Sequence, residues 1–316
     1  MSNLPSYANY EVVRQLGKGG MGVAYIVRSK DSAVTGFLAL KQVHCQNKQE
    51  GNSALKEAKI LRSLSHVNVV RYHDVFLHLD RGLQYVCTVM EYCRSGDLAQ
   101  HLLQTKQSGS QIEETVSLTW MLQLSTALAY LHDKRVIHRD LKPANVFLHL
   151  MSRSDFVLKL GDFGLSATLD GRNRTSQVGT PCYLAPEVLF NEPYAEPVDV
   201  WGVGCIFWEM VSLDFLYERR GMLAANVHSD PITQESLPAS ISTNVRKLVS
   251  ACLDSSPQER PTARELCKHL HKLLSGQPLQ LERTKVEPVD WTQPLMTGIE
   301  AIAESWSSGI SQLNIT

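Results

Sequence analysis

Four glycines stand within six residues near the start of the chain, in the segment Gly17-Lys-Gly-Gly-Met-Gly22. The segment 23–27 that follows, Val-Ala-Tyr-Ile-Val, has the residue types of a strand. A glycine-rich turn between two strands lets backbone N–H groups lie close over phosphate oxygens, because no side chain obstructs them. Taken alone, the segment is more typical of an ordinary hairpin, so a phosphate-binding role needs support from elsewhere in the chain.

A lysine and a glutamate suggest a second contact for phosphates. Lys41 ends the apolar run Ala39-Leu40, and Glu57 follows 16 residues later on an expected helix. A lysine held by a glutamate can point its ammonium group at a pair of phosphates. For Lys41 by itself, a solvated strand end is the simpler interpretation.

The densest set of reactive groups lies in the middle of the chain. Residues 138–145 read His-Arg-Asp-Leu-Lys-Pro-Ala-Asn, and Asp-Phe-Gly at 162–164 and Ala-Pro-Glu at 185–187 follow. With the glycine segment and the lysine in this order, the chain resembles a eukaryotic protein kinase over about residues 10–274. The resemblance implies ATP-dependent phosphoryl transfer to protein hydroxyl groups, and a two-lobed fold.

The resemblance assigns roles to the catalytic groups. Asp140 is expected to accept or orient the proton of the substrate hydroxyl, and Lys142 to contact the γ-phosphate. Asn145 and Asp162 are expected to hold Mg²⁺, with Mn²⁺ as a substitute, since hard oxygen ligands suit these ions. Such a reaction depends on positioning and on neutralising negative charge more than on covalent chemistry.

The resemblance also predicts the surroundings of ATP. The glycines would cover the nucleotide, Lys41 would bind the α- and β-phosphates, and the backbone after Met90 would hold the adenine. Asp97 would meet the ribose. The full set of expected ATP-binding residues is Gly17, Gly19, Gly22, Ala24, Ala39, Lys41, Glu57, Met90, Glu91, Cys93, Asp97 and Phe147.

Structural pairings are implied as well. Glu187 is expected to pair with Arg260, and Asp199 to brace the backbone of the catalytic loop. A stack of side chains is expected to join the two lobes: Leu61, Tyr72, His138 and Phe163. On this interpretation the histidine serves packing rather than acid–base chemistry.

Several stretches are similar to the NIMA-related kinases, among them 138–148, 159–166 and 178–188. Lys142 and Thr180 are typical of serine/threonine kinases. The resemblance to this family implies a role in mitosis and the cell cycle, or at centrosomes and cilia.

Regulation is expected at the activation segment. Arg139 precedes the catalytic aspartate, and an arginine cluster can order a segment that gains a phosphate. Ser176 aligns best with the family's phosphorylated position, and Thr175 is its neighbour. The modifying enzyme would be an upstream kinase or a second copy of the chain acting in trans.

The pattern along the chain predicts the elements that position these groups. Residues 10–92 are mostly strand-forming, with a helix near 53–64, and the remainder up to 274 is mostly helical. We therefore predict an α+β, bilobal kinase-like fold with a five-stranded antiparallel sheet plus one helix, and a larger helical lobe at 93–274. The helical lobe includes a buried helix over 198–211.

Two further segments flank the expected kinase domain. Residues 1–9 form an N-terminal extension, and residues 275–316 form a tail. Apolar residues at helical spacing predict an amphipathic helix over about 298–313. Packing on its own domain and docking to a partner protein are both open for this helix.

Composition limits the functional class. Lys and Arg total 31 against 32 Asp and Glu, so no basic excess favours nucleic acid or anionic membranes. The seven cysteines include no Cys-x-x-Cys pair, which favours a reducing compartment. No secretory signal or membrane span is expected, and the prediction is a cytoplasmic protein, at the cytoskeleton, centrosome or basal body, or in the nucleus.

Two alternative functions compete with that of a protein kinase. A pseudokinase would bind nucleotide and act as a scaffold, but Lys41, Glu57, Asp140, Asn145 and Asp162 are all present. A small-molecule kinase is the other alternative. The Gly-Thr-Pro and Ala-Pro-Glu segments argue against it, because they build a platform for peptides.

Overall fold

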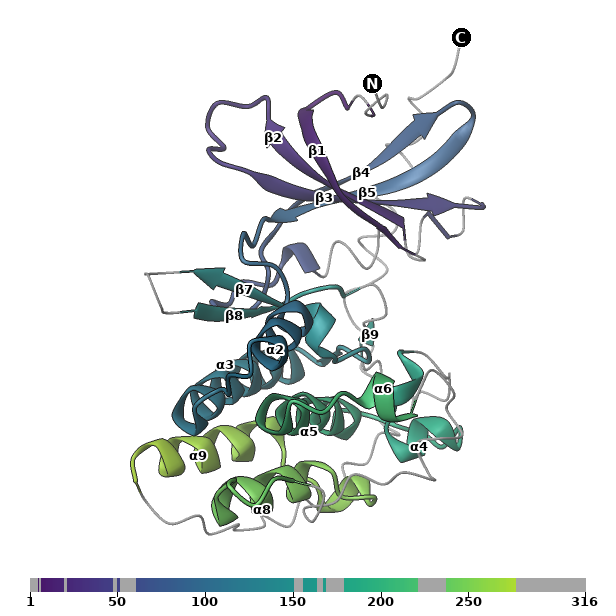
Figure 1. Ribbon diagram of the computed structural model, residues 1–316. Helices are drawn as coiled ribbons and strands as arrows, with labels where there is room; N and C mark the ends of the chain where they lie inside the picture. Colours follow the sequence, from purple (N-terminus) through teal and green to yellow (C-terminus); the bar gives the residue numbers. More distant parts are fainter. Residues whose placement is uncertain are drawn as a thin grey trace.

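The fold is known from a computed structural model of the 316-residue chain. The structure describes residues 5, 7–19, 22–47, 50–51, 61–150, 156–163, 167–168, 179–220 and 237–276. Figure 1 shows a sheet stacked above a group of helices, with a small hairpin between them. The predicted two-lobed α+β architecture is confirmed.

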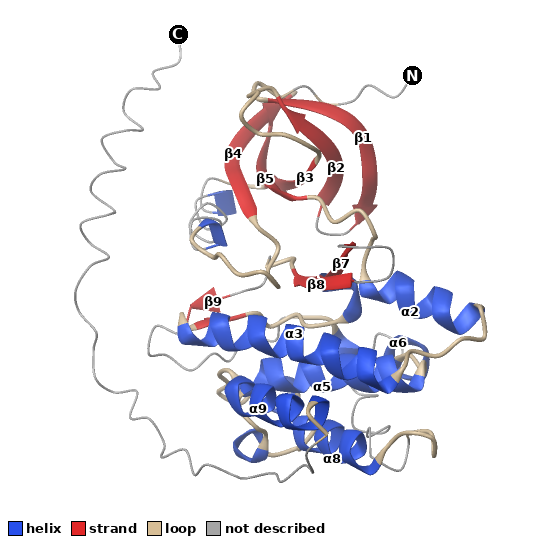
Figure 2. Ribbon diagram, turned by 90° about the vertical axis from the view of Figure 1, so that its left-hand side faces the viewer, coloured by secondary structure: helices blue, strands red, loops and turns tan. Residues whose placement is uncertain are grey.

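The upper lobe contains an antiparallel sheet of five strands in the order β1-β2-β3-β5-β4. The strands are β1 (Tyr10–Gly19), β2 (Gly22–Ser29), β3 (Leu38–Cys45), β4 (Tyr72–Asp80) and β5 (Leu83–Glu91). Seen from the side, they curl around a common centre (Figure 2). That centre holds its own apolar core, whose members include Val27, Leu40 and Val89.

The glycine segment lies in the first two strands. Gly17 pairs with Ala24 and Gly19 with Gly22 across β1 and β2. Gly22 has a φ of +124°, and a Cβ there would clash with the carbonyl oxygen of Gln42. The close approach to β3 therefore requires glycine at this position.

One strand begins later than the sequence pattern predicts. The apolar run from Val69 suggests a strand from that residue, but β4 starts at Tyr72. Val69 instead bridges Leu160, and the N–H of Val70 donates to the carbonyl of Leu160 at 2.9 Å. These residues form part of the joint between the lobes, because a partner far along the chain takes their hydrogen bonds.

The lower lobe is mostly helical. Its helices are α2 (Leu98–Gln107), α3 (Glu114–Asp133), α4 (Pro186–Leu189), α5 (Pro197–Ser212), α6 (Leu216–Arg220), α8 (Thr243–Cys252) and α9 (Ala263–Leu274). Short strands and turns carry the loops between them: β6 (Val136–Ile137), η1 (Pro143–Asn145), β7 (Val146–Leu150), β8 (Phe156–Leu160), β9 (Ala167–Thr168), η2 (Pro181–Tyr183) and η4 (Pro257–Glu259). β6 pairs with β9, and β7 with β8.

Helix α5 is the centre of this lobe. Residues 198–210 are all buried, which confirms the predicted buried helix. The helix ends at Leu213, whose φ of 53° lies in the left-handed region. Such a helix draws its stability from burial on all sides, so it is a rigid base for groups that project from it.

Local sequence accounts for several helix ends. Thr262 accepts the N–H of Glu265, whose carboxylate accepts the N–H of Thr262, so the two residues form a capping box at the start of α9. The side chains of Asp97 and Ser242 cap α2 and α8 by accepting one backbone N–H each. Most of the helix predicted at 53–64, and the whole of 298–313, lie outside the described residues.

Candidate active site

The loop at 138–145, which is expected to carry the catalytic groups, is held by one buried carboxylate. Asp199 projects from α5 and accepts the N–H groups of His138 and Arg139, both at 2.9 Å. His132, at the end of α3, lies 3.0 Å from the same carboxylate. Burial raises the pKa of Asp199, but the bonds and charges of its partners outweigh burial and hold the pKa below its ordinary value. The predicted brace is confirmed.

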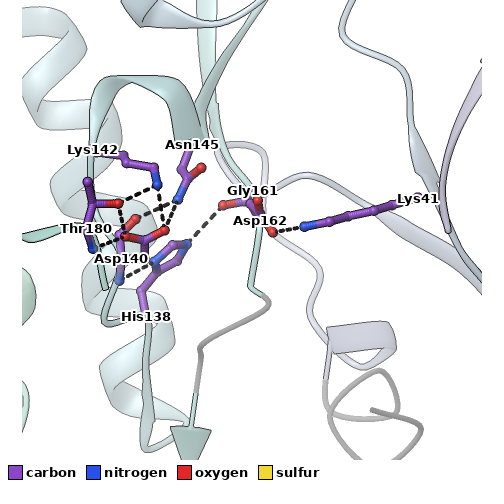
Figure 3. Close-up of polar contacts among 8 residues, drawn as sticks. All are labelled: Lys41, His138, Asp140, Lys142, Asn145, Gly161, Asp162 and Thr180. Atoms are coloured by element: carbon purple, nitrogen blue, oxygen red, sulfur yellow. Dashed lines mark hydrogen bonds and ion pairs between the residues drawn. The ribbon is translucent and has the colours of Figure 1, made fainter. Parts of the chain in front are cut away.

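Asp140 stands at the centre of a polar network that Figure 3 draws. Its carboxylate accepts the N–H of Thr180 at 2.9 Å and the hydroxyl of the same residue at 2.8 Å. The ammonium of Lys142 lies 2.9 Å from the carboxylate, and the amide of Asn145 donates to it at 2.9 Å. Burial raises the pKa of Asp140, but these partners lower it by more, so the pKa lies below its ordinary value. The carboxylate is therefore ionised at neutral pH.

Two oxygen-bearing side chains, Asn145 and Asp162, lie near Asp140 (Figure 3). The amide nitrogen of Asn145 donates to Asp140, so its amide oxygen is the atom left for a cation. Asp162 has a φ of 55° and forms an ion pair of 2.5 Å with Lys41. A carboxylate and an amide oxygen are the donors that Mg²⁺ prefers, so this pair of residues fits the expected ion.

The predicted stack between the lobes is present. The ring of Phe163 lies 4.8 Å from that of His138 and 6.1 Å from that of Tyr72. Leu61 is buried in the same core. His138 is fully buried, and its Nε2 lies 3.0 Å from the carbonyl oxygen of Gly161. Its role is to pack and to hold the Asp162 segment.

The segment that begins at Gly179 closes on the loop at 138–145. Gly179 has a φ of +119°, and a Cβ there would lie 2.8 Å from the carbonyl oxygen of Arg139. The tight approach brings Thr180 onto the catalytic carboxylate. Glu187 and Arg260 form a buried, two-point ion pair at 2.7 and 2.8 Å, as predicted.

The sheet side of the cleft carries the residues expected around ATP. Ala24 lies opposite Lys41 in the register of β2 and β3, and Ala39 lies opposite Met90 in that of β3 and β5. All four belong to adjacent strands. Lys41 projects from them toward the helical lobe, where it meets Asp162 (Figure 3).

The hinge, residues 92–97, connects β5 of the sheet to α2 of the lower lobe. Asp97 bridges Phe147 and accepts the N–H of Gln100 as the cap of α2. Burial raises the pKa of the Cys93 thiol to about 12, so the thiol stays protonated. Glu91 forms an ion pair of 3.0 Å with Lys159, which ties the hinge to β8.

Three expected site residues lie outside the described part of the chain: Glu57, Thr175 and Ser176. The pairing of Lys41 with Glu57 and the two phosphorylation sites therefore stay predictions. The C-terminal tail from residue 277 onward lies outside it as well.

Some contacts were not anticipated from the sequence. His132 on Asp199, and the Tyr183 hydroxyl on Glu209 at 2.9 Å, join segments far apart in the chain. Nothing in their local sequence identifies them. Thr180 had been noted as typical of serine/threonine kinases, but its hydrogen bonds to Asp140 appear only in three dimensions.

Two features are absent from the described residues. In the described ranges, His, Cys, Asp and Glu side chains do not gather in groups of three suited to a metal. None of the helices seen there is both long and apolar enough to span a bilayer.

Comparison with known proteins identifies the family. The protein kinase domain family matches residues 10–271. The chain is 34% identical to serine/threonine-protein kinase Nek3 of Oryza sativa subsp. japonica over 274 residues, covering 86% of this chain and 45% of that protein. It is 30% identical to serine/threonine-protein kinase Nek5 of Homo sapiens over 268 residues, covering 82% and 36%.

A third relative, serine/threonine-protein kinase Nek6 of Oryza sativa subsp. japonica, is 32% identical over 280 residues, covering 89% of this chain and 50% of the relative. The chain thus spans half or less of the length of these three relatives. With these matches, and with the expected braces around Asp140 in place, the chain belongs to the protein kinase family and is similar to its NIMA-related (Nek) serine/threonine members.

Proposed function

We propose that the chain transfers the γ-phosphate of ATP to serine or threonine hydroxyls of protein substrates. The observation that carries the proposal is the set of polar contacts that Asp140 makes. An ionised carboxylate, an ammonium group and an amide meet at the mouth of the cleft. A pseudokinase scaffold would have no need of this arrangement, and the described catalytic residues are all of the active type.

The chain's own residues have distinct tasks in the proposed reaction. Asp140 holds the substrate hydroxyl and accepts its proton as the oxygen attacks phosphorus. Lys142 supplies positive charge beside the transferred group, and Lys41 does so from the sheet side. Asn145 and Asp162 would hold Mg²⁺, which neutralises phosphate charge when it is bound.

The surroundings of the catalytic loop favour a polypeptide substrate. A cavity beside Lys142 and Thr180 is lined by Leu103 of α2, Tyr217 of α6 and Phe215, which precedes α6. An apolar surface next to the acceptor position suits a peptide segment better than a small polar metabolite.

The proposal includes finer assignments. The kinase unit is residues 10–274, with lobes at about 10–92 and 93–274, and the tail at 275–316 offers a docking segment for a partner. Phosphorylation of Ser176 or Thr175, by an upstream kinase or by another copy, orders the activation segment. The working location is the cytoplasm, cytoskeleton, centrosome or nucleus, in cell-cycle or ciliary tasks.

Radiolabelled phosphate transfer to generic protein substrates tests the central proposal. Wild-type chain should label serine and threonine, and Asp140→Asn should lower kcat by about 10²–10⁴-fold, the usual contribution of a general base. Asp133→Asn is a matched control, because Asp133 forms an exposed ion pair with Arg264 away from the cleft. Absence of transfer by wild-type chain after treatment with an activating kinase would favour the scaffold.

A further inference from the structure

A tyrosine outside the kinase family match is part of the core of the sheet lobe. The match begins at residue 10, yet the side chain of Tyr7 is only 1% exposed. Sequence patterns assign Tyr7 to a terminal extension. A fully buried aromatic residue in such an extension must fill a space that the rest of the lobe leaves open.

Tyr7 touches four of the five strands. Its neighbours are Tyr25 on β2, Gln42 on β3, Phe76 and His78 on β4, and Cys87 on β5. Its ring centroid lies 4.8 Å from that of His78 and 5.8 Å from that of Phe76, in edge-on contacts. The residue therefore lies in the apolar core that the strands share.

The backbone around Tyr7 is fixed as well. The ammonium of Lys30 donates to the carbonyl oxygens of Tyr7 and Ala8, both at 2.9 Å. The N–H of the same lysine donates to the carbonyl of Asn9 at 2.9 Å. These bonds hold residues 7–9 against the end of β2.

The hydroxyl of Tyr7 has one specific partner. It donates to the side-chain oxygen of Gln42 at 2.8 Å, and both residues are buried. Burial raises the pKa of Tyr7, so its hydroxyl remains a protonated donor. Removing the hydroxyl would leave the Gln42 oxygen without this donor in an apolar core.

Gln42 links this bond to the nucleotide side of the lobe. It follows Lys41 in β3, and neighbouring residues of a strand point to opposite faces. Its carbonyl oxygen is also the atom against which Gly22 packs. Hence the strand segment held from inside by Tyr7 is the one that presents the lysine and supports the glycine turn.

We propose that Tyr7 is a positioning residue for nucleotide binding, which acts through Gln42 to hold Lys41 and the glycine turn in place. The inference rests on the proposed function, since it assumes that ATP binds in this cleft. Tyr7 itself does not touch the nucleotide. Its effect should therefore appear in ATP affinity and not in the chemical step.

The test compares Tyr7→Phe with wild type in the full chain. We expect a weakening of ATP affinity by about threefold to tenfold, the effect of one lost hydrogen bond, with kcat at saturating ATP unchanged. Affinity is measured by titration with a fluorescent ATP analogue in the presence of Mg²⁺ at a temperature well below unfolding. KM for ATP and KM for a peptide substrate are measured in parallel, and only the former should rise.

Tyr10→Phe is the matched control. Tyr10 is also buried and also loses one hydroxyl bond, at 2.9 Å to Asp74, but that bond leads to β4 and not to β3. Its ATP affinity should change by less than about twofold. The double variant Tyr7→Phe, Gln42→Leu also lacks this bond and should bind ATP about as weakly as Tyr7→Phe alone, because both variants act on the same interaction.

Three outcomes would overturn the inference. Equal ATP affinities for Tyr7→Phe and Tyr10→Phe, with a lower Tm for both, would mean that Tyr7 serves stability alone. A fall in kcat with unchanged KM for ATP would contradict positioning through Lys41. If the wild-type chain itself binds no ATP, the proposed function fails first and the inference falls with it.

Discussion

In the helical lobe the loop at 138–145 rests on buried groups, whereas in the sheet lobe the groups expected to face ATP stand partly in solvent. The side chains of Asp199 and Glu187 are 1% and 2% exposed. That of Lys41, on the sheet side, is 24% exposed. Most of β1, including Gly17 and Gly19, is exposed too.

The difference has a physical consequence. Charges in a dry interior interact strongly but must be fully paired, while exposed pairs are weakened by water and salt. The helical side should therefore carry stability along with catalytic geometry. The sheet side should carry substrate binding at little cost to the fold, and four substitutions or conditions test this contrast.

Breaking the buried ion pair should have the largest effect on stability. Glu187→Gln keeps the shape of the side chain but leaves Arg260 without its countercharge, and we expect a loss of about 3–5 kcal/mol. Urea unfolding followed by circular dichroism measures it. The exposed pair of Asp133 and Arg264 is the control, and Asp133→Asn should cost about 0–1 kcal/mol.

Lys41→Met should affect activity while sparing the fold. The lost charge on the phosphates should lower kcat/KM by about 10²–10³-fold. Its partly exposed ion pair with Asp162 should contribute only about 0–1 kcal/mol of stability. A loss of stability as large as that of Glu187→Gln would break the contrast between the two sides.

Acid should weaken the helical side through Asp140. Its pKa in the folded chain lies below the ordinary 3.8, so the unfolded chain binds the proton more readily. The resulting stability is present above pH 3.8 and is lost as the pH falls through the lower, folded pKa. Unfolding measured from pH 7 downward should show a steeper decline for wild type than for Asp140→Asn. Parallel declines would contradict the depressed pKa.

Thr262→Ala should have the smallest effect. Thr262 lies on the helical side but is exposed, so only its capping bond to Glu265 is at stake. We expect a loss of about 1 kcal/mol and unchanged kinase activity. Thermal unfolding and a phosphate-transfer assay check both. A loss near that of Glu187→Gln would show that burial is a poor guide to stability here.

Much of the site could be anticipated because it is encoded in short segments. The catalytic loop at 138–145 holds Asp140, Lys142 and Asn145 within six residues, so local chain geometry brings them together. Residues 198–211 are nearly all apolar, which is enough to predict a buried helix. The predicted start of β4 at Val69 is wrong by three residues, because Val69 and Val70 pair with Leu160 instead.

By itself the amino-acid sequence determined the order of the motifs, the period of the helices and strands, and the cap at Thr262, since each depends on residues close together in the chain. Only the tertiary structure decided that His132 meets Asp199 and that Tyr7 meets Gln42, across 67 and 35 residues. Such contacts depend on how whole elements pack, and many different side chains satisfy the same local pattern. The packing of the folded chain selects the partner.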